Sequence, residues 1–426
     1  MTMATQAATN NRRMLLSRLL EARAETDALF RIVRPEAMYD RPIAERHRIV
    51  FYVGHLEAFD WNLLSGPCGL TSAHVEFDRI FAFGIDPVGG GLPADQPHDW
   101  PRLQIVNEYR DRIRQALDRA LETAPNDDPD QGEGSFGQRL HVALEHRLMH
   151  AETLAYMFHQ LPFERKTGAA AARVLQSGPF TPEGVRIPAG SASLGRLRRH
   201  SQVFGWDNEF EAHIVDVPEF TIDKYKVTNG QFLRFIEEGG YDDRSLWTEA
   251  DWDWKAAQGI SHPMFWVRRG NAWAYRSMFH EIPLPLDWPV YTSHAEASAY
   301  ARWAGKCLLT EAQWHRAAHG ARGQYPPSAA WDPAPVNASA LGVSAYGVAG
   351  LVANGWEWMS TEFAPFPGFR PFASYPGYSA QFFDGQHYVL KGGSVRTAAC
   401  MLRRSFRNWF QPHYQYVYAG FRCAHD

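Results

Sequence analysis

Two histidines, His146 and His150, stand four residues apart in the segment LEHRLMHAETL, residues 144–154. Side chains at this spacing lie on one face of an α-helix, with Cβ atoms about 5–6 Å apart, so both imidazoles can bind one metal ion. A third histidine, His55, lies in the apolar segment FYVGHLEAFDWNLL, residues 51–64. One imidazole from this segment and two from the other predict a three-histidine metal site with open coordination positions.

The residue types alone leave the ion open, because imidazole ligands suit zinc as well as iron. The alternative is that these histidines are hydrogen-bonded members of a helical core without any ion. Four nearby carboxylates are candidates to orient the rings by accepting hydrogen bonds from them: Glu57, Asp60, Glu145 and Glu152. His141 falls off the shared helix face, and His413 shows no partner spacing, so neither has a predicted role.

The histidines require helices to position them. Apolar residues recur at helical spacing in four segments of the first 165 residues: 11–34, 43–65, 103–124 and 136–161. This pattern predicts a helical bundle. The segment GIDPVGGGLPADQPHDWP, residues 84–101, is too rich in Gly and Pro for a helix and predicts a long connection on one face of the bundle.

Beyond residue 165 the pattern changes to short segments broken by Gly, Pro and Asn, with two clear helices at about 229–238 and 293–304. We therefore predict two domains, a bundle over residues 1–165 and an irregular α+β domain over residues 166–426.

The composition of the 426 residues indicates an ordinary globular protein. A formal charge of −4 gives no field that would attract nucleic acid, and no apolar run approaches the ~18 residues that spanning a membrane requires. The four cysteines have no CxxC spacing, so histidine must supply any metal ligands. We expect a cytoplasmic protein that acts on small molecules, with no nucleic-acid or membrane partner; the oligomeric state is left open.

The second half of the chain also resembles a known family of domains. Six ordered blocks resemble the formylglycine-generating-enzyme-like domain, a variant of the C-type lectin fold: FGWDNE, KVTNGQFLRFIEEGGY, PLDWPVYTSHAEASAYARWAGKCLLTEAQWHRAA, NGWEWMSTEFAPFPGF, VLKGGSV, and FRNWF with AGFR. The preceding segment with H…HxxxH resembles a DinB-like bundle. Together they are similar to the ergothioneine-biosynthesis sulfoxide synthases, and the similarity runs from about residue 12 to the end.

The resemblance implies a mononuclear non-haem Fe(II) held by His55, His146 and His150. It also implies an O2-dependent oxidoreductase that joins a chalcogen donor to the imidazole of hercynine, the trimethylated betaine of histidine. The family's RNWD block, which helps to hold substrate, reads RNWF here. Asn408 and Trp409 then correspond to hercynine contacts, with Arg407 and Phe410 beside them. We expect the active site between the two domains.

Two departures from the family pattern fall where a thiol donor would be recognised. Phe410 stands where the family has an acid, and FDRIFAFGIDPVGGG, residues 77–91, replaces the family's FNSYYEAVG. A carboxylate paired with the ammonium of the donor contributes about 1.5–3 kcal/mol, and a donor without an ammonium does not need it. The branch that joins hercynine to a selenosugar, selenoneine synthase, has such a donor and is the leading interpretation.

Three alternatives remain. The first is a sulfoxide synthase that uses cysteine or γ-glutamylcysteine, with Asp86 or Arg79 replacing the missing acid. The second is a formylglycine-generating enzyme, although Cys400 and Cys423 do not stand in the arrangement that this chemistry uses. The third is a non-catalytic, lectin-like binding protein whose bundle holds a structural metal.

A tyrosine upstream of the GGS block assists the oxygen chemistry of the sulfoxide synthases. The segment YPGYSAQFFDG offers Tyr378 and, as the weaker choice, Tyr375. The alternative is that both are packing residues of a tryptophan-rich domain.

Overall fold

The computed structural model describes the following residues: 3–72, 74–82, 93–123, 134–168, 181–198, 204–321, 331–338 and 341–425. It divides into two compact units. One comprises Met1–Ala169 with Phe372–Ser374, and the other comprises Ala170–Pro371 with Tyr375–Asp426. None of the helices in the described ranges combines the length and the apolar character needed to cross a bilayer.

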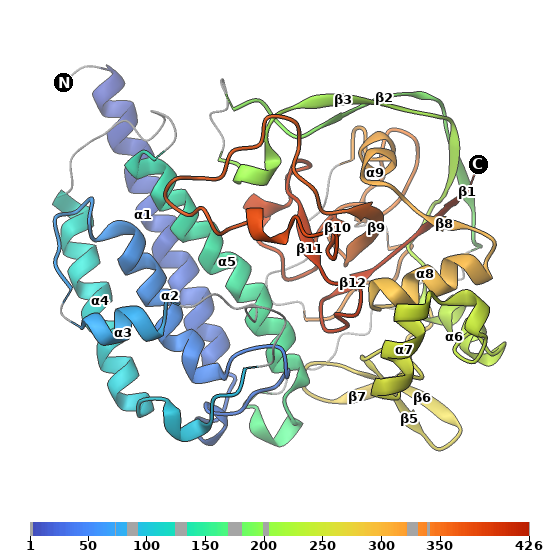
Figure 1. Cartoon of the computed structure of the whole chain (residues 1–426), viewed down its shortest axis with the longest axis horizontal. Coiled ribbons are helices and arrows are strands. Elements are labelled where there is room, and N and C mark those ends of the chain that lie inside the picture. The colour runs from blue at the N-terminus through green and yellow to red at the C-terminus, as the bar shows by residue number, and fades with distance from the viewer. Residues whose placement is uncertain are drawn as a thin grey trace. The chain divides into compact units, whose positions relative to one another are not determined.

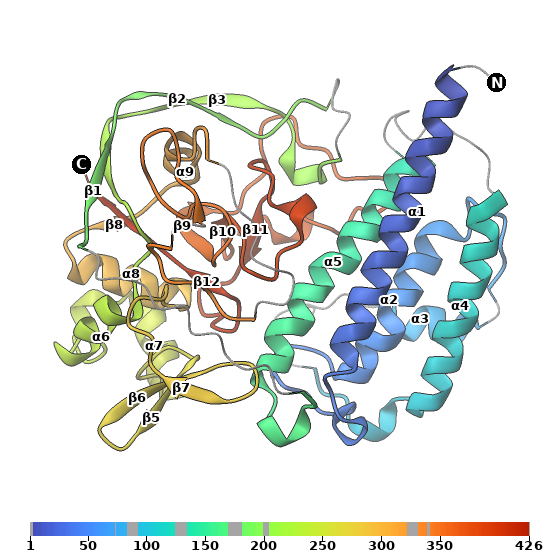
Figure 2. The same ribbon diagram turned by 180° about the vertical axis from the view of Figure 1, so that it is seen from behind.

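The first unit is a helical bundle (Figure 1). Its described helices are α1 (Met3–Phe30), α2 (Ile49–Leu64), α3 (Val75–Ile80), α4 (Leu103–Thr123) and α5 (Phe136–Gln160). The four long helices match the four predicted segments, whereas the six-residue α3 was not predicted because it is too short to show a period. Helix α1 packs on α5, and α2 packs on both α4 and α5. Figure 2 shows the same arrangement from behind.

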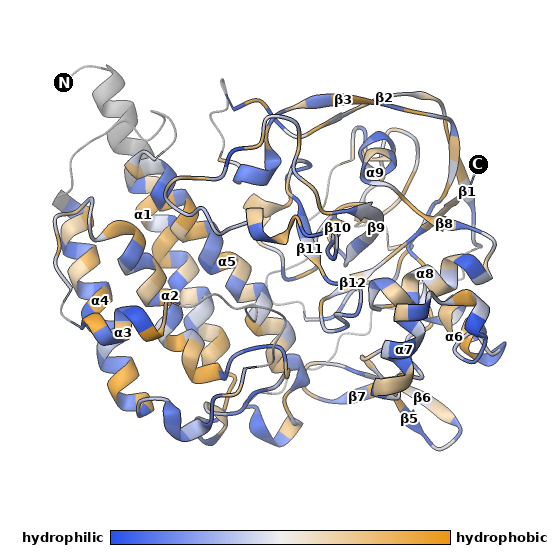
Figure 3. Cartoon of the chain, viewed as in Figure 1, coloured by the Kyte–Doolittle hydropathy of each residue, from blue (hydrophilic) through white to orange (hydrophobic). Residues whose placement is uncertain are grey.

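Helix α2 occupies the interior of the bundle. Fourteen of its 16 residues are buried, and its ribbon is largely coloured as hydrophobic in Figure 3. Helix α5 begins at Ser135, whose hydroxyl accepts a hydrogen bond from the backbone N–H of Gln138 and so satisfies one of the free donors at the helix start. Six apolar residues along α5 are buried: Leu140, Leu144, Leu148, Ala151, Ala155 and Phe158.

The second unit mixes short strands with short helices. Its helices are α6 (Asn229–Glu237), α7 (Glu249–Gln258), α8 (His294–Trp303) and α9 (Glu311–Ala317). The prediction of two helices, now α6 and α8, was incomplete, because α7 and α9 are also present. Thr228, Ser293 and Thr310 cap α6, α8 and α9, each in a reciprocal capping box.

Two four-stranded sheets organise this unit. One has the order β1-β4-β13-β8, from Gly184–Ile187, Phe220–Asp223, Cys423–His425 and Cys307–Leu308. The other has the order β11-β10-β9-β12, from Asn408–Phe410, Tyr388–Lys391, Trp356–Glu362 and Ala419–Gly420. The remaining strands form the pair β2 (Gly190–Leu194) with β3 (His213–Val217), and the meander β5 (Trp266–Arg269), β6 (Ala272–Arg276) and β7 (Glu281–Pro283).

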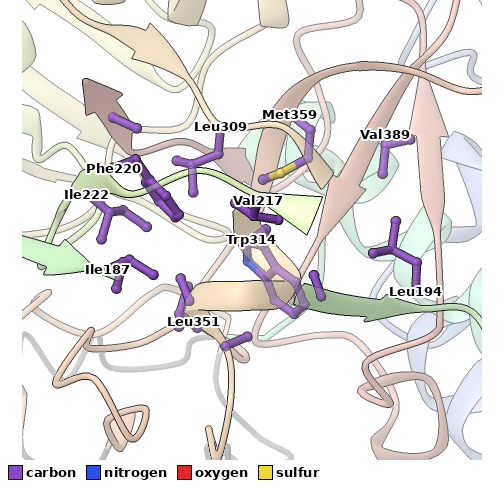
Figure 4. Close-up of a cluster of buried hydrophobic side chains, with 14 of the residues drawn as sticks. Ile187, Leu194, Val217, Phe220, Ile222, Leu309, Trp314, Leu351, Met359 and Val389 are labelled. Atoms are coloured by element: carbon purple, nitrogen blue, oxygen red, sulfur yellow. The ribbon is translucent and has the colours of Figure 1, made fainter. Parts of the chain in front are cut away.

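An apolar core joins these elements. Ile187, Phe220 and Ile222 from β1 and β4 pack with Trp314 of α9 and Met359 of β9 (Figure 4). Because the strands are short, large aromatic side chains supply much of the buried surface that long regular elements would otherwise provide.

Candidate metal centre and C-terminal block

The three predicted imidazoles converge in the interior of the bundle. Nε2 of His150 lies 3.2 Å from Nε2 of His55 and 3.2 Å from Nε2 of His146. The three side chains are 2–5% exposed, and one ring nitrogen from each lies within 4.8 Å of the others. Helix α2 supplies one ring and α5 supplies two, as the four-residue spacing predicts.

The ring of His55 is oriented by the backbone. Its Nδ1 lies 2.7 Å from the carbonyl oxygen of Phe81. Because a carbonyl only accepts, Nδ1 carries the proton, and the neutral ring turns the lone pair of Nε2 towards the other two histidines. Gly54 permits this contact, since a Cβ there would lie 2.5 Å from the ring of Phe81.

Burial keeps the three imidazoles neutral. It lowers the pKa of His55 to about 4. Burial, reinforced by the neighbouring histidines, also holds the pKa values of His146 and His150 well below the usual range. Neutral imidazole is the form that binds a metal ion.

The spacing of the nitrogens fits a single ion. Two imidazole nitrogens that each bind an ion at about 2.1 Å lie roughly 3.0–3.4 Å apart for ligand angles between 90° and 109°. The two distances of 3.2 Å from His150 fall within this range. Nδ1 of His150 is buried and has no hydrogen-bond partner among the described residues. No donor group therefore requires Nδ1 to act as an acceptor. The ring proton can lie on Nδ1, and Nε2 can serve as the ligand atom.

Aromatic rings enclose the three histidines. Phe59 stacks on His146 with centroids 3.4 Å apart, and Phe51 stacks on His55 at 4.9 Å. These contacts limit rotation of the two rings and keep water from their faces, which strengthens electrostatic interactions inside the site.

A buried ion network ties the two ligand-bearing helices together. Arg147, between the two histidines of α5, donates to Asp60 at 2.7 Å, to Glu57 at 3.1 Å and to the carbonyl of Leu56 at 3.0 Å. Arg114 of α4 also donates to Glu57, at 2.8 Å. The side chains of Arg147, Glu57 and Asp60 at the centre of this network are fully buried.

The prediction that Glu57 and Asp60 orient the histidines was therefore wrong. Their carboxylates accept hydrogen bonds from arginines, because two buried charges on α2 require buried positive partners. The acceptor for His55 is a backbone carbonyl in the segment 77–91, which a search for carboxylates could not find.

Arg407, at the start of the C-terminal block, is 2% exposed. Its Nε lies 3.1 Å from a carboxylate oxygen of Glu311, and its Nη1 donates to the carbonyl of Ala364 at 2.9 Å. The guanidinium also lies 4.0 Å from the centroid of Phe366. These contacts fix the start of β11.

The next three residues divide between the two faces of β11. Side chains alternate along a strand, so Asn408 and Phe410 share one face and Trp409 lies on the other. Trp409 stacks on Phe363 at 4.3 Å, and Phe410 stacks on Tyr414 at 5.0 Å. Asn408 accepts a hydrogen bond from the N–H of Trp409.

The two candidate tyrosines lie in one aromatic cluster. Tyr378 is 7% exposed, stacks on Trp206 at 3.9 Å and meets Trp409 edge-on at 5.3 Å. The centroid of Tyr375 lies 5.8 Å from that of Tyr378. Tyr378 thus reaches the C-terminal block directly.

Two residues were predicted as possible replacements for the acid that Phe410 does not supply. Arg79 is exposed on α3, whereas Asp86 lies outside the described residues.

Comparisons with known proteins agree with both halves of this architecture. Residues 18–154 match the DinB superfamily, and residues 172–426 match the sulfatase-modifying factor enzyme 1-like domain. The combination defines a class of proteins in which a DinB-type bundle precedes a domain of the formylglycine-generating type.

Curated relatives narrow the class. The chain is 37% identical over 339 residues to hercynine oxygenase of Mycolicibacterium smegmatis, covering 73% of this chain and 75% of that protein. It is 25% identical to ergothioneine biosynthesis protein 1 of Neurospora crassa, covering 95% of this chain and 56% of that protein. Formylglycine-generating enzyme of Mycobacterium tuberculosis is 26% identical, covering 57% of this chain and 97% of that protein. The chain belongs to the hercynine oxygenase family and is an oxidoreductase.

Proposed function

We propose that this chain catalyses the O2-dependent formation of a carbon–chalcogen bond on the imidazole of hercynine, with Fe(II) held by His55, His146 and His150. The observation that carries the proposal is the convergence of three buried imidazoles, with Nε2 of His150 lying 3.2 Å from Nε2 of His55 and from Nε2 of His146, in a chain related to hercynine oxygenases. When bound, Fe(II) would supply the redox chemistry that O2 requires and lower the pKa of a thiol or selenol ligand.

The reaction balances with O2 as the only oxidant. Joining an imidazole C–H to an S–H or Se–H, with loss of both hydrogens, removes two electrons. Transfer of one oxygen atom to the chalcogen removes two more. O2 accepts all four, so the products are the oxide of the joined compound and one molecule of water.

The chain's own residues then bind hercynine and move a proton. We assign hercynine contacts to Asn408 and Trp409, since an aromatic face suits a quaternary ammonium that cannot donate a hydrogen bond. Arg407 acts as a positioning residue, because Glu311 and the backbone already occupy its guanidinium. We assign proton supply to Tyr378 in preference to Tyr375, because Tyr378 contacts Trp409.

The donor that we propose is a selenosugar. Phe410 stacks on Tyr414 with an interplanar angle of 5°, so this position offers an apolar ring and no charge to an ammonium group. A sugar donor lacks that group and loses nothing by the change.

The second candidate donor is cysteine or γ-glutamylcysteine. The names of the relatives, hercynine oxygenase and ergothioneine biosynthesis protein 1, favour it. Another residue would then have to replace the carboxylate that Phe410 does not provide.

Competition between donors tests the proposal. The purified protein is given Fe(II), hercynine and O2 with equal amounts of 1-seleno-β-D-glucose, cysteine and γ-glutamylcysteine, and the products are identified by mass spectrometry. We expect the hercynine–selenosugar adduct to dominate, and to disappear when a chelator removes the metal. A dominant cysteine or γ-glutamylcysteine adduct would select the second candidate, and no hercynine adduct with any donor would contradict the function itself.

A further inference from the structure

A histidine–carboxylate pair lies in the second unit, outside the three-histidine centre. Nε2 of His413 is 2.8 Å from Oδ1 of Asp251, and the hydroxyl of Thr248 donates to Oδ2 of the same carboxylate at 2.6 Å. Thr248 also caps α7, so the helix start fixes the position of Asp251. The ring of His413 stacks on Trp254 at 4.6 Å with an interplanar angle of 3°.

This geometry sets the tautomer of His413. In the neutral ring Nε2 carries the proton that Asp251 accepts, so Nδ1 is a hydrogen-bond acceptor. No hydrogen bond to Nδ1 is formed by the described residues, and the side chain is 31% exposed. An acceptor that is both oriented and accessible is therefore available to a ligand.

A second imidazole acceptor lies beside the pair. His294, the first residue of α8, is 8% exposed, and its Nε2 has no hydrogen-bond partner among the described residues. Burial lowers its pKa to about 4, and both Asp251 and His413 are close enough to affect that pKa. The backbone N–H of Ala295 donates to the carbonyl of Pro412 at 3.1 Å, which holds the segment of His413 against the start of α8.

Aromatic rings continue from these acceptors to the C-terminal block. His294 stacks on Tyr388 at 3.8 Å. Tyr388 lies opposite Phe410 in the antiparallel pair of β10 and β11, so the two rings share one face of the sheet. Asn408 is on the same face, two residues before Phe410.

We propose that His413, His294 and the flanking rings of Tyr388 and Trp254 form a binding subsite for a hydroxyl-rich ring of the sugar type. A hydroxyl group would donate to the accessible Nδ1 of His413, the buried ring of His294 would support the adjoining wall, and the C–H face of the sugar ring would pack on the aromatic surface. An ammonium group fits less well, because His413 and Thr248 already occupy both oxygens of Asp251. The inference rests on the proposed function, for which it names the residues that recognise the donor.

Steady-state kinetics of the full-length, iron-loaded protein test the subsite, with hercynine and either 1-thio-β-D-glucose or cysteine as the donor. H413F keeps a ring on Trp254 but removes both nitrogens. We expect its KM for thioglucose to rise about three- to tenfold, as loss of one hydrogen bond to the ligand predicts. The KM values for cysteine and hercynine should change less than about twofold.

The matched control is H387F. His387 also bonds to a carboxylate, with Nδ1 2.9 Å from Oδ1 of Asp384, and it immediately precedes Tyr388, so its side chain lies on the opposite face. The control should match the wild type with both donors. An unchanged KM for thioglucose in H413F, or an equal rise for cysteine or hercynine, would overturn the subsite.

A direct binding measurement separates the subsite from the reaction. If the wild type turns over no donor, the proposed function fails, but saturation-transfer NMR with methyl β-D-glucopyranoside still tests the subsite. The subsite predicts a signal in the wild type and in H387F, and a clearly weaker one in H413F. No signal in the wild type, or an undiminished one in H413F, would refute it.

Discussion

The three-histidine centre and the C-terminal block are built in opposite ways. Two long helices, α2 and α5, carry the histidines, and a fully buried ion network holds the helices in register. The C-terminal block is a three-residue strand, β11, held by ring stacking and by one buried arginine. In the metal centre, the spacing of residues along each helix determines where the histidine side chains lie. In the C-terminal block, the positions of the side chains depend on residues such as Glu311 and Phe363, which are far away in the sequence.

The difference predicts that the two regions respond separately to mutation. Changes in the bundle should alter metal binding, whereas changes in the C-terminal block should alter substrate binding and leave the metal in place. Four substitutions test this comparison of the two regions, in order of decreasing effect.

H146A should abolish the metal centre. Removing one of three ligands leaves two imidazoles, so we expect iron content to fall to background and product formation to drop by at least about 100-fold. Metal analysis and product assays measure these two properties, and circular dichroism checks that the helices remain folded. H141A on the same helix is the control and should retain iron. An H146A protein with full iron content would contradict the ligand assignment.

R147M should weaken the bundle itself. It leaves Asp60 buried with Arg23 as its remaining positively charged partner at 3.9 Å, and breaking a buried pair costs about 3–5 kcal/mol. The free energy of unfolding in urea gives the loss. R110M, which removes a partly exposed pair with Asp111, should cost less than about 1 kcal/mol. Equal losses in the two variants would show that the buried network has no special part in stability.

G54A should lower metal affinity without removing a ligand. The added Cβ would press on the ring of Phe81 at 2.5 Å and shift the carbonyl that orients His55, a type of change that costs about tenfold in affinity. Competition with a chelator measures the change. At Gly66 an added Cβ meets nothing within 4 Å, so G66A should bind metal as the wild type does. Unchanged affinity in G54A would mean that the carbonyl contact is dispensable.

N408A should weaken the binding of hercynine without changing metal binding. We expect the KM for hercynine to rise about three- to tenfold through loss of a polar contact, while iron content stays at the wild-type level. Kinetics and metal analysis on the same preparation distinguish a change in hercynine binding from a change in iron content. Loss of iron in N408A would break the separation between the two regions.

The sequence predicted the long helices and the histidine convergence, because both follow from periods that are visible along the chain. It did not predict the Phe81 carbonyl or the partners of Glu57 and Asp60, since these depend on how one helix packs against another. His413 showed no partner spacing because Asp251 is 162 residues away. Long-range pairs of this kind leave no local pattern.

The buried charges between α2 and α5 also bear on how quickly an ion could leave. Arg147 lies next to His146, and its partners Glu57 and Asp60 follow His55 by two and five residues. If α2 and α5 move apart beside the histidines, these charges must separate inside an apolar interior, which costs several kcal/mol. We therefore expect exchange with a chelator to be slow and steeply dependent on temperature, because it would follow breathing of the whole bundle rather than the motion of one side chain.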